Sequence, residues 1–158
     1  IPVELTRFFA DLCSSNTQRP AYMIQVSSLA VELPIPAMPY YNAAKSALSA
    51  FTQSLLLDGE LPFRIIDFRP GDFKTEFMNN PSIARSATAG SPIHRTLVQR
   101  HLDAPEPEAA ALRLIAAMSR KHCGILRSGR FFQSRIAPLG PRLLPTGLLH
   151  RLIRSYYR

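Results

Sequence analysis

The chain has 158 residues, 46% of them hydrophobic, which is enough for one domain with a proper core. No apolar run reaches the roughly 18 residues of a membrane-spanning helix. The formal net charge of +8 is uneven, because residues 1–108 hold nine Lys or Arg and eleven Asp or Glu, whereas residues 109–158 hold ten Lys or Arg and no acid. The start of the chain has no basic region followed by a long apolar stretch, so a secretory leader is not expected.

The first part of the chain predicts a strand, a long helix and a second strand. The apolar runs at 21–27 and 64–68 have the length of buried strands. Residues 41–60 are rich in Ala and Leu and predict a helix, whereas the three prolines of 29–39 exclude one there. A helix over 3–13 precedes this unit. Two strands joined by a helix with short links predict an α/β fold with parallel strands.

The last part predicts three helices and one more strand. Helices are expected near 92–103 and over 106–121, followed by a strand at 124–129 and a final helix near 146–158. Phe131 and Phe132 are expected in the core. The two cysteines, Cys13 and Cys123, have neither metal-binding nor redox spacing, so we expect buried free thiols. Reduced thiols without a leader favour the cytoplasm.

Three residues carry a chemical pattern: Ser28, Tyr41 and Lys45. Tyr41 and Lys45 lie four apart, so they share one face of the predicted helix. Ser28 follows the first strand, at the end of a parallel sheet where ligands bind. We expect the Lys45 ammonium to lower the pKa of Tyr41, which would then exchange a proton with a substrate oxygen held by Ser28. Tyr40 serves as an internal control, because Ala44 stands four residues after it.

The stretch VSSLAVELPIPAMPYYNAAKSAL resembles the active site of short-chain dehydrogenase/reductases, in which a strand ends in a serine pair and Tyr-x-x-x-Lys opens a long helix. The resemblance covers residues 1 to about 130. It implies a Rossmann-like, doubly wound parallel sheet, with Ser28, Tyr41 and Lys45 as the catalytic trio. It also implies an oxidoreductase that passes hydride between NAD or NADP, with NADP preferred, and a carbonyl or alcohol substrate.

A second motif of the same family follows the second strand. RIIDFRPGDFKTEF supplies its Pro-Gly pair and a threonine. The resemblance implies that Pro70, Gly71, Phe73 and Thr75, together with Tyr41 and Lys45, contact the cofactor. For Asp72, a role in capping the loop and a cofactor contact both stay open. Residues 79–105 stand where the family has its substrate-covering loop. Apolar residues there that could line a pocket are Met78, Ile83, Ile93, Leu97 and Val98.

One family motif is missing. The chain has seven glycines and no glycine-rich phosphate-binding turn. We therefore expect residues 1–133 to be the C-terminal half of the catalytic domain, inactive in isolation. A non-catalytic interaction module is the alternative. The family also implies a homodimer or homotetramer, for which residues of helix 41–60 offer small and apolar surface: Ala47, Ala50, Phe51, Ser54 and Leu55.

The extension 134–158 is basic and ends in an amphipathic helix. On a helical wheel, one half of 148–158 is apolar or aromatic, and the other holds arginines, a histidine and a serine. Three surfaces could receive the apolar half: the body of the enzyme, where it would close the substrate pocket; an anionic membrane contacted by 142–158, with a lipid-like substrate; or a second subunit. The basic residues are interleaved with Leu and Ile, so no nucleic acid is expected.

Overall fold

The computed structural model describes residues 2–15, 20–79 and 91–157. Its centre is a parallel sheet of three strands, β1 (Tyr22–Val26), β2 (Arg64–Pro70) and β3 (Gly124–Ser128), in the order β1-β2-β3. Tyr22 lies opposite Arg64, and Ile66 lies opposite Gly124. The mixed α/β architecture and the parallel, adjacent pair of strands predicted from the sequence are confirmed.

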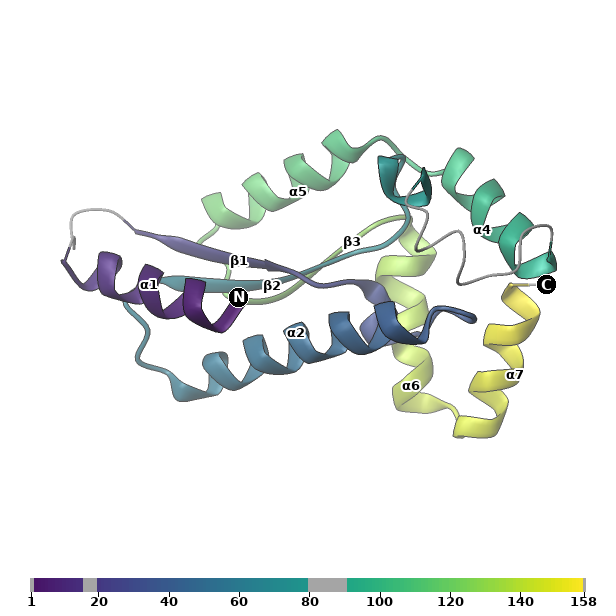
Figure 1. Cartoon of the computed structure of the whole chain (residues 1–158), viewed down its shortest axis with the longest axis horizontal. Helices are drawn as coiled ribbons and strands as arrows, with labels where there is room; N and C mark the ends of the chain where they lie inside the picture. The colour runs from purple at the N-terminus through teal and green to yellow at the C-terminus, as the bar shows by residue number, and fades with distance from the viewer. Residues whose placement is uncertain (1, 16–19, 80–90, 158) are drawn as a thin grey trace.

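Helices cover both faces of this sheet (Figure 1). The helices α1 (Pro2–Ser15) and α2 (Pro39–Asp58) pack on one face, around Cys13, Phe63 and Ile65. The helix α5 (Pro107–Ser119) packs on the other face, around Ile66 and Phe68. Successive residues of β2 therefore serve opposite cores, and this explains why the strand is buried from Ile65 to Arg69.

The long helix α2 begins two residues earlier than predicted, because Pro39 fits a first helical turn, in which its missing N–H costs nothing. It ends where Gly59 takes up a left-handed backbone with φ 76°, a conformation that glycine adopts at little cost. Tyr41 and Lys45 therefore lie in its first turns. Leu55, one of the residues predicted to offer surface to a second subunit, is partly buried and packs against the core of its own chain. Ala47, Ala50 and Ser54 are exposed, and dimerisation through α2 stays a prediction.

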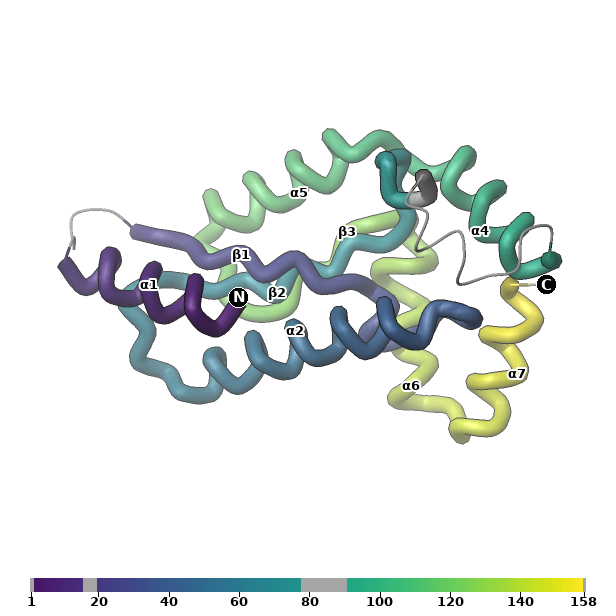
Figure 2. The backbone as a smooth tube through the Cα atoms, in the orientation of Figure 1, coloured from purple at the N-terminus to yellow at the C-terminus, as the bar shows by residue number. Residues whose placement is uncertain are grey.

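The rest of the chain gathers at the carboxyl end of the strands (Figures 1 and 2). The short 3-10 helices η1 (Leu29–Val31) and η2 (Glu76–Asn79) follow β1 and β2, and α4 (Pro92–Leu102) lies beyond them. After β3 come a π-helical turn, η3 (Phe132–Ile136), then η4 (Ala137–Leu139), α6 (Gly140–Leu143) and α7 (Thr146–Tyr156). No helix among the described residues is long and apolar enough to cross a membrane.

Two expectations about burial are wrong. Cys13 is buried as expected, but Cys123 is exposed because it stands in the turn before β3. Phe131 and Phe132, expected in the core, are 73% and 51% exposed. They follow β3 at the open end of the sheet, beyond the layer of apolar side chains that α5 covers.

Candidate active site

The predicted site residues meet at the carboxyl end of the sheet. Ser28 follows β1, the segment 70–75 begins at the last residue of β2, and Tyr41 and Lys45 come from the first turns of α2. All of them line one pocket of about 960 Å³, except Lys74 of that segment. The structure thus brings together every residue predicted for catalysis or cofactor binding, including Pro70, Gly71, Phe73 and Thr75.

Ser28 is held in place by the turn that it begins. Its hydroxyl accepts a hydrogen bond from the backbone N–H of Ala30 at 3.1 Å and so caps η1. The residue is 6% exposed, and the interaction of its side chain with the Tyr41 phenol lowers the pKa of that phenol. The Ser28 hydroxyl is therefore oriented beside the Tyr41 phenol.

Tyr41 lies with its ring edge-on to Phe77, with 5.2 Å between the ring centroids. Burial raises the pKa of the Tyr41 phenol, the hydrogen bond with Ser28 lowers it, and the negative charge of Asp72 raises it; the net shift is upward. The expectation that Lys45 lowers the pKa of Tyr41 is wrong in this structure. Tyr41 is therefore a protonated phenol at neutral pH, suited to donate a proton.

The position of Lys45 explains why it does not lower the pKa of Tyr41. Its Nζ donates a hydrogen bond of 2.8 Å to the backbone carbonyl of Val26 and lies 5.9 Å from the centroid of the Tyr41 ring. Burial lowers the pKa of the Lys45 ammonium, so its own charge is disfavoured. Lys45 lies beside the phenol and is tied to the end of β1.

The segment after β2 approaches its neighbours closely. The N–H of Gly71 donates to the carbonyl of Ser128 at 2.7 Å. A Cβ atom on Gly71 would lie 3.0 Å from Oε1 of Gln133 and 3.1 Å from Leu29, so a larger residue here would require both side chains to shift by a few tenths of an ångström. Thr75 accepts a hydrogen bond from the N–H of Phe77 at 3.3 Å. The hydroxyl proton of Thr75 is not used in that contact.

Asp72, for which two roles were open, accepts a hydrogen bond from Nε2 of Gln133 at 2.5 Å. It thereby joins the end of β2 to η3, and it also lines the pocket. Oε1 of the same Gln133 is buried and has no hydrogen-bond donor among the described residues. Gln133 was not predicted from the sequence, because no local pattern links a residue after β3 to one after β2.

A buried charge network below the pocket was also missed. Asp67 is 0% exposed, and its carboxylate accepts hydrogen bonds from Ser27, from Ser49 at 2.7 Å and from Gln53 at 3.2 Å. Arg69 forms ion pairs with Asp67 at 2.8 Å and with Glu32 at 2.5 Å. The signal in the sequence was the pair Asp67 and Arg69 at alternate positions of a strand that is mostly apolar after Arg64, which places both on one face.

This network reaches the site through the chain neighbours of Ser28. Ser27 precedes it and bonds to Asp67, whereas Glu32 ends the turn that Ser28 caps. Arg127 of β3 also pairs with Glu32 at 2.8 Å. The loop that carries Ser28 is therefore tied to β2 through the buried Asp67 and Arg69, and to β3 through the half-buried pair of Glu32 and Arg127.

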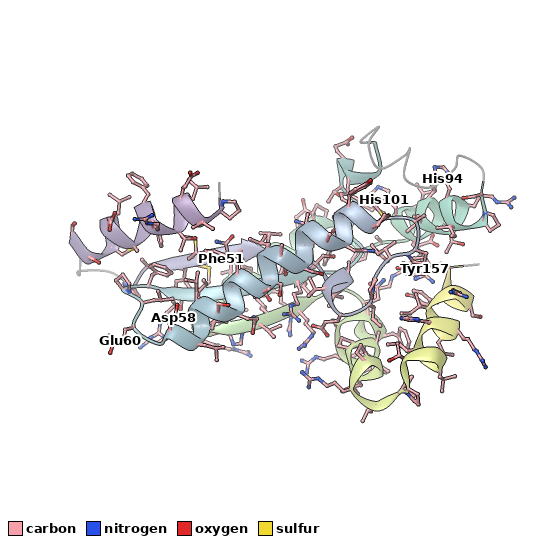
Figure 3. The ribbon with its side chains drawn as sticks, turned by 60° about the horizontal axis from the view of Figure 1, so that its bottom comes forward. Phe51, Asp58, Glu60, His94, His101 and Tyr157 are labelled. Carbon is pink, nitrogen blue, oxygen red and sulfur yellow. The ribbon has the colours of Figure 1, made fainter. Side chains whose placement is uncertain are left out.

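The far side of the pocket is built by the C-terminal elements. The lining includes Leu149, Leu152 and Ile153 of α7, along with Tyr157 just after it. Figure 3 shows Tyr157 at the end of α7 and His101 on α4 at this end of the molecule, and both line the pocket. His101 was not predicted from the sequence as a site residue.

Of the apolar residues predicted for the substrate-covering loop, Leu97 lines the pocket, but Ile93 and Val98 do not. Ile93 stands one turn before Leu97 on the same face of α4, whereas Val98 stands on a different face. Ile83 lies outside the described residues, as does the side chain of Met78.

The parts of the chain that the structure describes hold no cluster of three or more His, Cys, Asp or Glu side chains that could bind a metal ion. Comparison of the chain with family models, with curated proteins and with solved structures finds no significant match.

Proposed function

We propose that this chain carries the catalytic half of an NAD(P)-dependent oxidoreductase of the short-chain dehydrogenase/reductase type, which reduces a carbonyl to an alcohol. The observation that carries the proposal is the meeting of Ser28, Tyr41 and Lys45 with the segment 70–75 in one pocket. These residues come from separate elements, and their spacing matches the family pattern at both motifs. A Rossmann-like sheet and NADP as the preferred cofactor are parts of the same proposal.

Ser28, Tyr41 and Lys45 have different roles in the proposed reduction. The Ser28 hydroxyl donates a hydrogen bond to the carbonyl oxygen and polarises it. The Tyr41 phenol donates its proton to that oxygen as negative charge develops there; such general acids contribute roughly 10²–10⁴-fold to rate. Lys45 orients the cofactor and returns a proton toward Tyr41. The raised pKa of Tyr41 supports reduction, because it keeps the phenol protonated.

A bound nicotinamide would supply the hydride. The segment after β2 fits its carboxamide, because the hydroxyl of Thr75 is a donor and Oε1 of Gln133 is a buried acceptor without a partner among the described residues. Because Gly71 has no side chain, Gln133 and Leu29 pack directly against its backbone. The chain has no glycine-rich turn for the cofactor phosphates, so we propose that these are bound outside residues 1–158.

The dependence of turnover on pH tests this assignment. In the intact protein we expect carbonyl reduction to stay constant from neutral pH to beyond about 10, the usual pKa of tyrosine, and then to fall as Tyr41 loses its proton. Alcohol oxidation needs the phenolate and should rise over the same alkaline range. The measurement is the initial rate in each direction, followed by the absorbance of the reduced nicotinamide. A reduction rate that already declines as the pH is raised from 7 to 8 would contradict a Tyr41 with a raised pKa as the proton donor.

A further inference from the structure

We infer that the substrate of this site is a neutral, elongated, apolar carbonyl compound or alcohol, and that α7 forms the wall against which its apolar body packs. The inference rests on the proposed function for the reacting carbonyl or hydroxyl group, and on the pocket for the shape, charge and polarity of the rest of the substrate. Its starting point is that one continuous pocket holds both the catalytic trio and the apolar face of α7.

The helix α7 turns one face to the pocket and the other away. Leu149, Leu152 and Ile153 line the pocket, whereas His150, Arg151 and Arg154 do not. The helix packs little of this face on protein, since it contains no buried residue and Leu152 is 49% exposed. An apolar face that lines a cavity beside a proton donor is suited to an apolar ligand.

Contacts near its C-terminal end hold α7 at this position. The guanidinium of Arg100 in α4 stacks on the ring of Tyr156, 3.3 Å from the centroid, and donates a hydrogen bond of 2.8 Å to the Tyr156 carbonyl. Phe132 of η3 lies 6.3 Å from the same ring. At the other end, Leu149 is packed so closely on Gly140 that a Cβ there would lie 3.0 Å from it. These contacts favour a pocket wall over a helix free to enter a membrane.

The opposite wall is also apolar and well supported. It includes Leu33 and Ile35 from the loop before α2, and Asn42 fixes that loop with two hydrogen bonds to the backbone of Ile35, at 2.8 and 3.2 Å. The pocket volume of about 960 Å³ lies at the upper end of the roughly 300–1,000 Å³ of ligand pockets. Room therefore remains for an extended ligand in addition to the nicotinamide ring.

The charges of the lining argue against an anionic substrate. Among the described residues that line the pocket, the only Lys, Arg, Asp or Glu side chains are Lys45 and Asp72, which have opposite signs. Lys45 is bound to the carbonyl of Val26, and the arginines of α7 point elsewhere. A carboxylate or phosphate on the substrate would find no lysine or arginine in the described lining except Lys45, which is already hydrogen-bonded, to replace its water. The substrate is therefore uncharged.

The test is equilibrium displacement of the neutral dye Nile red from the full chain, without nicotinamide. Hexanol, octanol and decanol should displace it with affinity rising about 3- to 4-fold per methylene group, as burial of each group predicts. Decanoate should bind at least about 10-fold more weakly than decanol, because its charge would lose water. Equal affinity of decanoate and decanol, or no dependence on chain length, would overturn the inference.

Matched variants locate the ligand on α7. Leu152→Ser should weaken decanol binding about 10-fold, whereas Leu148→Ser should leave it unchanged, because Leu148 stands on the same helix but outside the lining. Equal effects of the two variants, together with loss of binding to anionic vesicles or of a dimer, would show that α7 serves a membrane or a second copy and would overturn the inference. Because displacement needs no turnover, it can succeed where the proposed oxidoreductase activity fails, and the two failures are distinguishable.

Discussion

Tyr41→Phe in the intact protein is expected to lower the turnover of a carbonyl substrate by roughly 10²–10⁴-fold. The change removes only the phenolic hydroxyl, so the edge-on contact with Phe77 and the fold of α2 remain. Substrate and cofactor should bind with nearly normal affinity, because the loss concerns a proton delivered in the transition state. The measurement is the steady-state rate of carbonyl reduction at varied concentrations of the reduced nicotinamide cofactor.

The matched control is Tyr40→Phe. Tyr40 is the neighbouring tyrosine, 87% exposed and outside the pocket lining, so its hydroxyl should not affect turnover. Near-normal turnover by Tyr41→Phe, or an equal loss in the two variants, would remove Tyr41 from the role of proton donor.

The second large effect concerns stability. Asp67→Asn should lower the free energy of unfolding by about 3–5 kcal/mol, because it leaves the buried guanidinium of Arg69 without one of its two carboxylate partners. Ser27 and Ser49 would also lose a charged acceptor. Urea-induced unfolding, followed by circular dichroism, gives the difference as a shift of the midpoint at constant slope.

Asp58→Asn is the control for that change, because Asp58 is an exposed carboxylate at the end of α2 (Figure 3). It should shift stability by no more than about 0.5 kcal/mol. An Asp67→Asn variant as stable as Asp58→Asn would show that the network contributes nothing to folding. In a double-mutant cycle with Arg69→Met, the two losses should be less than additive, because both variants break the same ion pair.

Local patterns in the sequence were sufficient for the elements that carry the site. The apolar runs of β1 and β2 and the Ala-rich α2 placed Ser28 after a strand and Tyr41 and Lys45 on one helical face, as the structure has them. These features depend on residues near one another in the chain. The parallel pairing followed because two strands joined by a helix run in the same direction.

The features that were missed depend on contacts between distant segments. Gln133 reaches Asp72 across 61 positions, and Arg127 reaches Glu32 across 95. The direction of the pKa shift of Tyr41 depends on burial, which spacing does not report. The wheel of α7 showed an apolar face, but it could not decide which surface that face meets, because an enzyme body, a membrane and a subunit require the same pattern.

The most direct test of the central claim is the transfer of deuterium. Reduced nicotinamide carrying deuterium at the position that transfers hydride is incubated with the intact protein and a panel of apolar aldehydes and ketones, and the alcohols formed are analysed by mass spectrometry. We expect an alcohol with one deuterium on its carbinol carbon, formed by Tyr40→Phe as by the unchanged protein and lost in Tyr41→Phe. Alcohols without deuterium, or no alcohol from any member of the panel, would contradict it.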